Sequence, residues 1–273
     1  MKDWFRKLLI IVFVIISLLA FGQAIHLAID NRNAEQKNAL AQSVAGAPLI
    51  TTETPATHTD VPAAETVPPE TTEAVLPPDE NTSYLQQLNI PALQEINPEV
   101  IGWIYIPDSQ INYPLLHTNN NSTYLYASWD GEYNAAGSIF LEAQCSPALN
   151  DFNTIIYGHN MLSGSMFAEL HHYRDYSYYQ LHPYIYITTN DAIYRYKVFS
   201  AYVAGVGTDT YRLRFTGDEK TQALAHYINS SVWEAELTPT SEDFILTLST
   251  CPGTGKFEFR WVVQAVQNGK WDK

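Results

Sequence analysis

Residues 244–265 read FILTLSTCPGTGKFEFRWVVQA, two apolar runs separated by a stretch rich in Pro and Gly. Side chains along a β-strand alternate between its two faces. On one face the first run places Phe244, Leu246 and Leu248, and the second run places Phe257, Phe259, Trp261 and Val263. The pattern predicts an antiparallel hairpin whose aromatic and aliphatic face covers a core.

The opposite face of this hairpin carries the reactive side chains. If both apolar faces cover the same core, Arg260 emerges on the face of Cys251, because a slip of one residue would turn the aromatic row into solvent. A guanidinium beside a thiol favours the thiolate, which is the nucleophilic form. The alternative is a surface arginine paired with Glu258.

Beyond the hairpin, the composition and hydrophobic pattern of residues 84–273 indicate one β-rich domain. Short helices are predicted between residues 84 and 97, and a helix over 218–231 is expected to be capped by Asp218 and to bury Leu224, Tyr227 and Ile228. Runs typical of strands lie at 101–106, 112–116, 137–141, 154–157, 184–188, 192–202, 244–249 and 257–265. Strands at this spacing predict a closed barrel or a sandwich.

The N-terminal residues 1–30 predict a membrane anchor. Residues 8–29 are almost entirely apolar and would form a helix of about 33 Å, enough for a hydrocarbon core of about 30 Å. Basic residues precede the run and acidic residues follow it, which places the N-terminus in the cytoplasm. A cleaved signal peptide is the alternative, since small residues near position 22 offer cleavage sites.

Residues 31–83 are rich in Pro, Thr, Ala and Glu and contain no aromatic residue. Such a segment buries too little apolar surface to offset its ordering entropy, so we expect a disordered linker. The net charge of −14 argues against nucleic acid as a partner, because Lys and Arg dominate contacts to phosphates.

A second candidate motif is NTIIYGHN at residues 153–160, an apolar strand that ends at Gly158 and His159. A glycine lets the backbone approach a site closely, so His159 is well placed for a cleft. Together Cys251, His159 and Arg260 would supply a nucleophile, a proton donor and a cation near a developing oxyanion. The second cysteine, Cys145, leaves a disulfide with Cys251 open, whereas neither cysteine has the neighbours of a zinc site.

These motifs resemble the sortases, the cysteine transpeptidases of Gram-positive surfaces. TLSTC at 247–251 precedes Arg260 by nine residues, and YGHN lies upstream at 157–160. Further stretches are similar to class B sortases, namely NPEVIGWI (97–104), AGSIF (136–140), GSMF (164–167) and RWVV (260–263). The resemblance implies a mainly β fold, an eight-stranded barrel with N-terminal helices and a helix before the cysteine-bearing strand.

The resemblance also implies the roles of the site residues. Cys251 would attack the carbonyl of a threonine in a C-terminal sorting pentapeptide, His159 would transfer protons, and Arg260 would bind the substrate backbone or the oxyanion. The residues expected to line the peptide site are Asn121, Ser249 and Thr250. No metal or other cofactor is implied. The partners would be surface proteins bearing a sorting signal and a peptidoglycan-precursor amine or a pilin lysine.

Two other functions are compatible with this pattern, and two further cysteine enzymes are disfavoured by it. A cysteine peptidase would hydrolyse the same thioacyl intermediate, and a non-catalytic surface module would bind glycan or peptide through the many tyrosines. An L,D-transpeptidase would carry a His-Gly-Cys signature before its nucleophile, which this chain lacks. A papain-like hydrolase is disfavoured because its cysteine precedes its histidine, the reverse of the order here.

Overall fold

The computed structural model describes residues 2–47, 77–250 and 258–273. Cys251, Phe257 and most of the expected linker lie outside these ranges. The helices and 3-10 turns are α1 (Lys2–Ala45), α2 (Glu80–Gln86), α3 (Ile90–Gln94), η1 (Thr123–Leu125), η2 (Ala168–Arg174), α4 (Tyr176–Leu181), η3 (Asp209–Tyr211) and α5 (Glu219–Ser230). The strands are β1 (Val100–Tyr105), β2 (Asn112–Leu116), β3 (Ile139–Leu141), β4 (Asn153–Tyr157), β5 (Tyr184–Thr188), β6 (Ala192–Gly205), β7 (Ile245–Thr250) and β8 (Phe259–Asp272).

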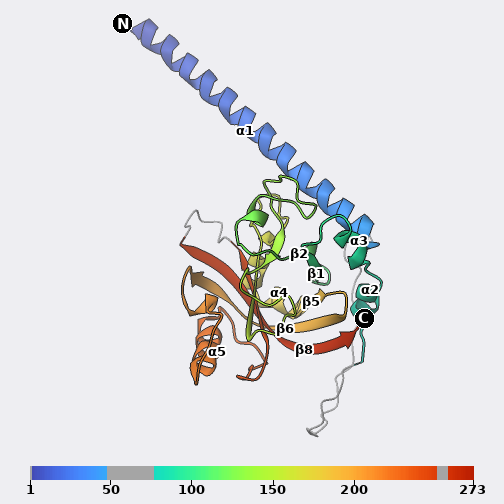
Figure 1. Cartoon of the computed structure of the whole chain (residues 1–273). Coiled ribbons are helices and arrows are strands. Elements are labelled where there is room, and N and C mark those ends of the chain that lie inside the picture. Colours follow the sequence, from blue (N-terminus) through green and yellow to red (C-terminus); the bar gives the residue numbers. More distant parts are fainter. Residues whose placement is uncertain (1, 48–76, 251–257) are drawn as a thin grey trace, which may run out of the picture.

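The strands curve round into a barrel (Figure 1). Their order in the closed barrel is β1-β2-β3-β4-β7-β8-β6-β5. The pairs β2–β3 and β4–β7 are parallel and the other pairs are antiparallel. The prediction of a barrel of eight strands is therefore confirmed. β3 begins two residues later than expected, because Gly137 has a φ of +60°, which lies outside the range of a β-strand. A side chain at this position would also clash, since a Cβ would lie 2.5 Å from the carbonyl oxygen of Tyr124.

The alternation predicted for the hairpin is present in β7 and β8. Leu248 pairs with Val263 and Thr250 with Trp261, and the inward side chains Leu248, Val263 and Trp261 belong to the barrel core. On the outer face Val262 packs with Tyr227 of α5. Because both faces are covered, every residue of β7 is buried, including the polar residues Thr247, Ser249 and Thr250.

Helix α5 differs from its prediction in two details. Leu224 and Tyr227 are buried as expected, but Ile228 is 37% exposed. Asp218 occupies the N-cap position without a side-chain hydrogen bond, at φ −81° and ψ 3°. The Glu219 carboxylate instead accepts from the amide and hydroxyl of Thr216, so the end of the helix is stabilised by its own first residue.

The expectation of a disordered linker over 31–83 is wrong for the residues described. Helix α1 continues without a break to Ala45, and Ala34, Ala41 and Ala45 of this helix are buried against the domain. Residues 34–45 are mostly Ala, Gln, Lys and other good helix formers, and their small side chains allow close packing without aromatic residues. At the other end of the segment, Asp79 caps α2 and pairs with Arg195 of β6 (3.2 Å).

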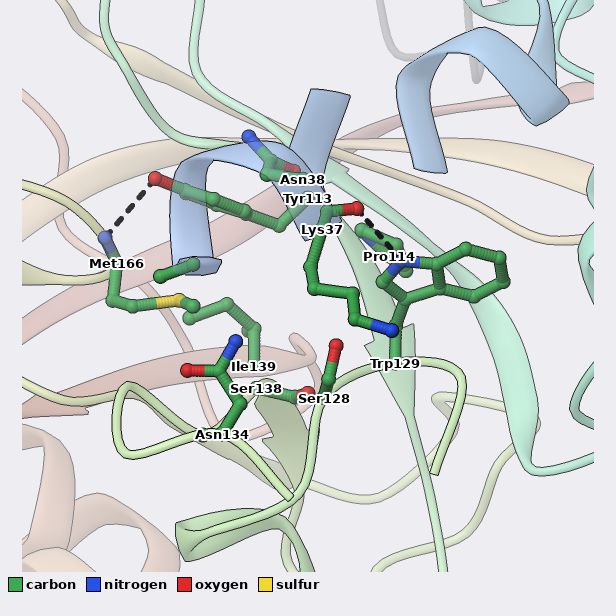
Figure 2. A pocket seen from close by; sticks show the side chains of 12 residues that line it. Lys37, Asn38, Tyr113, Pro114, Ser128, Trp129, Asn134, Ser138, Ile139 and Met166 are labelled. Atoms are coloured by element: carbon green, nitrogen blue, oxygen red, sulfur yellow. Dashed lines mark hydrogen bonds between the residues drawn. The ribbon is translucent and has the colours of Figure 1, made fainter. Parts of the chain in front are cut away.

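The C-terminal end of α1 is clamped to the loop between η1 and β3 (Figure 2). Lys37 pairs with Asp130 and with Glu132 (2.6 Å), and the backbone carbonyl of Lys37 accepts from the indole of Trp129 (2.8 Å). Below the helix lies a cavity of ≈ 20 Å³, which is about the space of one water molecule. Its lining includes Tyr113, whose hydroxyl accepts from the amide of Met166 (3.0 Å). The cavity thus belongs to the contact between α1 and the barrel.

Candidate active site

Two parallel neighbouring strands, β4 and β7, end at the same edge of the barrel, where Tyr157 pairs with Ser249. His159 follows Tyr157 by two residues, and Cys251 follows Ser249 by two residues. Adjacent strands lie about 4.8 Å apart, so this register favours a close approach of the two reactive residues. Cys251 itself lies outside the described residues, and its contact with His159 remains a prediction.

Gly158 determines where the backbone of His159 lies. Its amide donates to the carbonyl of Ser249 (3.2 Å), and the carbonyl of His159 accepts from the amide of Phe167 (2.9 Å). A Cβ at Gly158 would lie 2.5 Å from Cδ1 of Ile139 and 2.7 Å from the ring of Phe167. Only glycine fits here, in agreement with the close approach expected from the sequence.

We expect Gly158→Ala to destabilise the fold by about 1–3 kcal/mol, because the added methyl group overpacks the site. Activity should fall as well, since the backbone shift moves His159. Thermal melting and peptide cleavage are the measurements. Ile139→Val removes the contacting Cδ1 atom and should restore part of both losses in the double variant. If Gly158→Ala melts and cleaves like the wild type, the packing at this position is not as described.

The imidazole of His159 is half-buried and is oriented by a hydrogen bond to the backbone. Its Nε2 lies 2.8 Å from the carbonyl oxygen of Leu125, and its ring lies 6.3 Å from that of Tyr126. A carbonyl oxygen can only accept, so Nε2 carries a proton. Nδ1 is then the nitrogen that can gain or lose a proton during a reaction.

Arg260 and Trp261 point to opposite faces of β8, as predicted. Trp261 is 2% exposed and donates from Nε1 to the carbonyl of Leu170 inside the barrel (2.7 Å). Arg260 is half-buried, and its Nη1 donates to the carbonyl of Phe259 (2.8 Å). Thr250, the last residue of β7, pairs with Trp261 of β8. In this antiparallel register, the residue of β8 next to Trp261 on the side of Cys251 is Arg260.

The residues expected to line a peptide site are engaged with the protein. Asn121 donates from Nδ2 to Glu142 (2.7 Å) and accepts from the amide of Ala143 (2.8 Å). Ser249 is 1% exposed and shares a hydrogen bond with the hydroxyl of Tyr211 (2.9 Å). Thr250 is 2% exposed, on the inner face of the barrel. A role in binding peptide stays a prediction for all three, and for the two strand residues it requires rearrangement.

Glu142 and Tyr157 are part of this region, although the sequence analysis did not select them. The hydroxyl of Tyr157 donates to the Glu142 carboxylate (2.9 Å). Burial raises the pKa of Tyr157 far above its usual value, and the nearby charge of Glu142 adds to the effect. The sequence signal that could have identified Glu142 is its place directly after the apolar run of β3. A carboxylate buried at such a position needs hydrogen-bond donors, so it indicates a network of polar partners.

Cys145 is a core residue. Its thiol is buried and free, donates to the carbonyl of Asn153 (3.6 Å), and has a pKa raised to about 12, mainly by burial. Asn153 pairs with Ile245, and Thr250 lies five residues farther along β7, on the order of 16 Å. Bridged cysteines need Cα atoms within about 7 Å, and residue 251 is one peptide bond from Thr250. This separation argues against a disulfide between the two cysteines, and because Cys251 lies outside the described residues its absence stays a prediction.

The family model described as "Sortase domain" matches residues 104–268. The chain belongs to the sortase family. Sortase B of Listeria monocytogenes is 35% identical over 176 residues, which cover 63% of this chain and 71% of that protein. Sortase B of Staphylococcus aureus is 33% identical over 161 residues, which cover 59% of this chain and 66% of that protein.

Solved structures agree with this assignment. A Staphylococcus aureus sortase B–substrate complex has a TM-score of 0.63 at 31% identity and covers 68% of this chain and 86% of that chain. Sortase B from B. anthracis has a TM-score of 0.67 at 29% identity and covers 88% and 99%. The similarity to class B sortases predicted from the motifs is confirmed, and the chain is a sortase-type cysteine transpeptidase.

Proposed function

We propose that this sortase cleaves a C-terminal sorting pentapeptide after threonine and transfers the acyl group to an amine of a cell-wall precursor. The observation that carries the proposal is that the ends of β4 and β7 and the start of β8 lie at the same edge of the barrel. His159 follows β4, Arg260 is the second residue of β8, and the strand between β4 and β8 is β7, which leads directly into Cys251. This order of strands favours one nucleophile between an acid–base group and a cation.

In the proposed first step the thiolate of Cys251 attacks the threonine carbonyl carbon, and the carbonyl oxygen becomes negative beside Arg260. Preorganised donors stabilise such an oxyanion most strongly where water is excluded. Breakage of the peptide C–N bond then needs a proton on the leaving amine, which Nδ1 of His159 supplies. The product is a thioester between Cys251 and the surface protein.

In the second step an amine attacks the thioester carbonyl and gives a proton to His159, and the Cys251 thiolate leaves. A peptidase would use the same residues with water in place of the amine. The two outcomes are separated by mass spectrometry of the products formed from a library of sorting peptides, with and without peptidoglycan-type amines. An amide product supports transfer, whereas the free acid as the sole product with amine present would exclude it.

The same assay distinguishes the acceptors. A cell-wall amine and a pilin lysine differ in the neighbouring peptide, so each gives a product of a different mass. Membership of the sortase family, which in general acts on cell-wall precursors, makes that precursor the first acceptor to test. If no sorting peptide is cleaved and no thioacyl adduct forms, the alternative of a non-catalytic binding module takes precedence.

We further propose that α1 anchors the enzyme in the cell membrane, with the catalytic domain outside. Among the described residues, α1 is the one helix long and apolar enough to cross a bilayer. Its basic N-terminal residues favour a cytoplasmic N-terminus. Lys37 follows Ile29, the end of the apolar run, by eight residues, or about 12 Å of helix. A continuous helix would therefore hold the domain close to the lipid headgroups, where a lipid-linked acceptor is available.

Reversing the charge of Lys37 should break its pairing with Asp130 and Glu132, so that the domain is no longer held at a fixed distance from the lipid surface. In the full chain in lipid nanodiscs, Lys37→Glu places a third carboxylate beside Asp130 and Glu132, and like charges at this separation repel. We expect a longer and broader distance between a dye on the domain and the lipid surface, measured by energy transfer. Asp130→Lys in the Lys37→Glu background should restore the distance.

Lys270→Glu, a charge reversal at an exposed residue of β8, is the matched control and should change nothing. An unchanged distance in Lys37→Glu would rule out the clamp. Hydrogen bonding to Lys37 holds the pKa of Asp130 below its usual value despite partial burial. The clamp is therefore fully formed at neutral pH and weakens as the pH falls through that lowered value.

A further inference from the structure

A buried carboxylate lies behind the site and has no part in the two chemical steps. Glu142 directly follows β3 and is 7% exposed. Its Oε2 accepts from Nδ2 of Asn121 (2.7 Å) and from the hydroxyl of Tyr157 (2.9 Å), and its Oε1 accepts from the amide of Gln144 (3.4 Å). Burying a carboxylate costs free energy unless hydrogen bonds replace those lost to water, and these three donors supply that compensation.

The two side-chain partners of Glu142 belong to the two segments that support His159. Asn121 precedes η1, whose last residue, Leu125, holds Nε2 of His159 through its carbonyl. Tyr157 ends β4, two residues before His159. Glu142 thus ties the loop that orients the imidazole ring to the strand that carries its backbone.

The remaining contacts keep Glu142 itself in place. Its amide donates to the carbonyl of Ile155 in β4 (2.8 Å), and its carbonyl accepts from the amide of Cys145 (2.9 Å). The raised pKa of Tyr157 keeps the phenol protonated at neutral pH, so it remains a donor to the carboxylate. Loop, strand and carboxylate therefore form one rigid support.

We propose that Glu142 is a positioning residue that sets the orientation of the His159 ring through Asn121 and Tyr157. The proposal rests on His159 acting as the acid–base group of the proposed function. It concerns a residue that does not touch substrate: a loosened ring would present Nδ1 to the leaving amine in fewer molecules, which lowers kcat and leaves KM nearly unchanged.

The test uses Glu142→Gln and Tyr157→Phe, and the second variant removes only a hydroxyl group. We expect kcat for peptide cleavage to fall about tenfold to a hundredfold in each, the range for one lost hydrogen bond to a charged group. The double variant should be little worse than either single one, because both break the same link. Tyr202→Phe, which removes the buried hydroxyl bonded to Thr210 (2.9 Å), is the matched control.

A second readout does not depend on catalysis. In the Cys251→Ala background, the ring nitrogen and Nε2 proton resonances of His159 are followed by NMR at a fixed pH. Both variants should broaden or lose the Nε2 proton signal and shift the ring nitrogen resonances, while Tyr202→Phe leaves them unchanged. Unchanged His159 resonances in folded Glu142→Gln and Tyr157→Phe would overturn the proposal, whatever happens to activity. An inactive wild type would instead count against the proposed function and leave this readout intact.

Discussion

Cys251→Ala is expected to abolish peptide cleavage and transfer, while Cys145→Ser leaves both nearly intact. A thiolate is the nucleophile in acyl transfer of this kind, and the described residues at this edge of the barrel include no second thiol. Cys145 cannot substitute, because its thiol lies near the start of β4 and burial raises its pKa to about 12. Serine at this position keeps a donor for the carbonyl of Asn153.

Intact-mass spectrometry after incubation with a sorting peptide measures the first result directly. Wild-type protein and Cys145→Ser should both gain the mass of the acyl group, and Cys251→Ala should not. Melting curves of both variants show whether the fold is kept. Protein from oxidised culture in which the two cysteines are joined, or an acyl adduct on Cys251→Ala, would refute the assignment.

The second large effect is expected at Arg260. Its planar guanidinium offers a fork of donors to a peptide carbonyl that becomes negative, and the ammonium of lysine has the charge without the fork. Loss of one oxyanion donor typically costs about 10² to 10³ in rate. Arg260→Lys should therefore lose about 10²-fold in kcat/KM with little change in Tm, and Arg260→Ala should lose more.

Trp261→Ala is the matched control on the opposite face. Trp261 is buried in the barrel, donates to Leu170 and stacks under the guanidinium of Arg174 (4.9 Å). Its removal should cost about 3–5 kcal/mol of stability, as for other large core side chains. Kinetics beside melting curves separate the two effects. Near-normal activity in Arg260→Lys, or unfolding of Arg260→Ala, would show that the arginine has another role.

The pattern of residues 244–265 was sufficient to predict the register of β7 and β8 and the outward position of Arg260. Burial forces this outcome, because Trp261 and Val263 can reach the core in only one of the two alternations. The eight strands, the apolar N-terminal run and the glycine before His159 were likewise readable. In each case the deciding interaction is local, or follows from the hydrophobicity of one short segment.

Other features depend on which segments meet in the folded chain. The apolar side chains on the buried face of residues 34–45 are small alanines, which are a weak sign of a partner in the sequence. This segment is helical where these alanines pack against the domain and Lys37 meets Asp130 and Glu132, more than ninety residues away in sequence. The burial of Ser249 and the clamp of Asn121 on Glu142 also follow from neighbours that only barrel closure brings together. Sequence alone thus determined which faces of its strands are apolar, while the tertiary structure decided which polar groups are paired, because a pairing is set by distance in space.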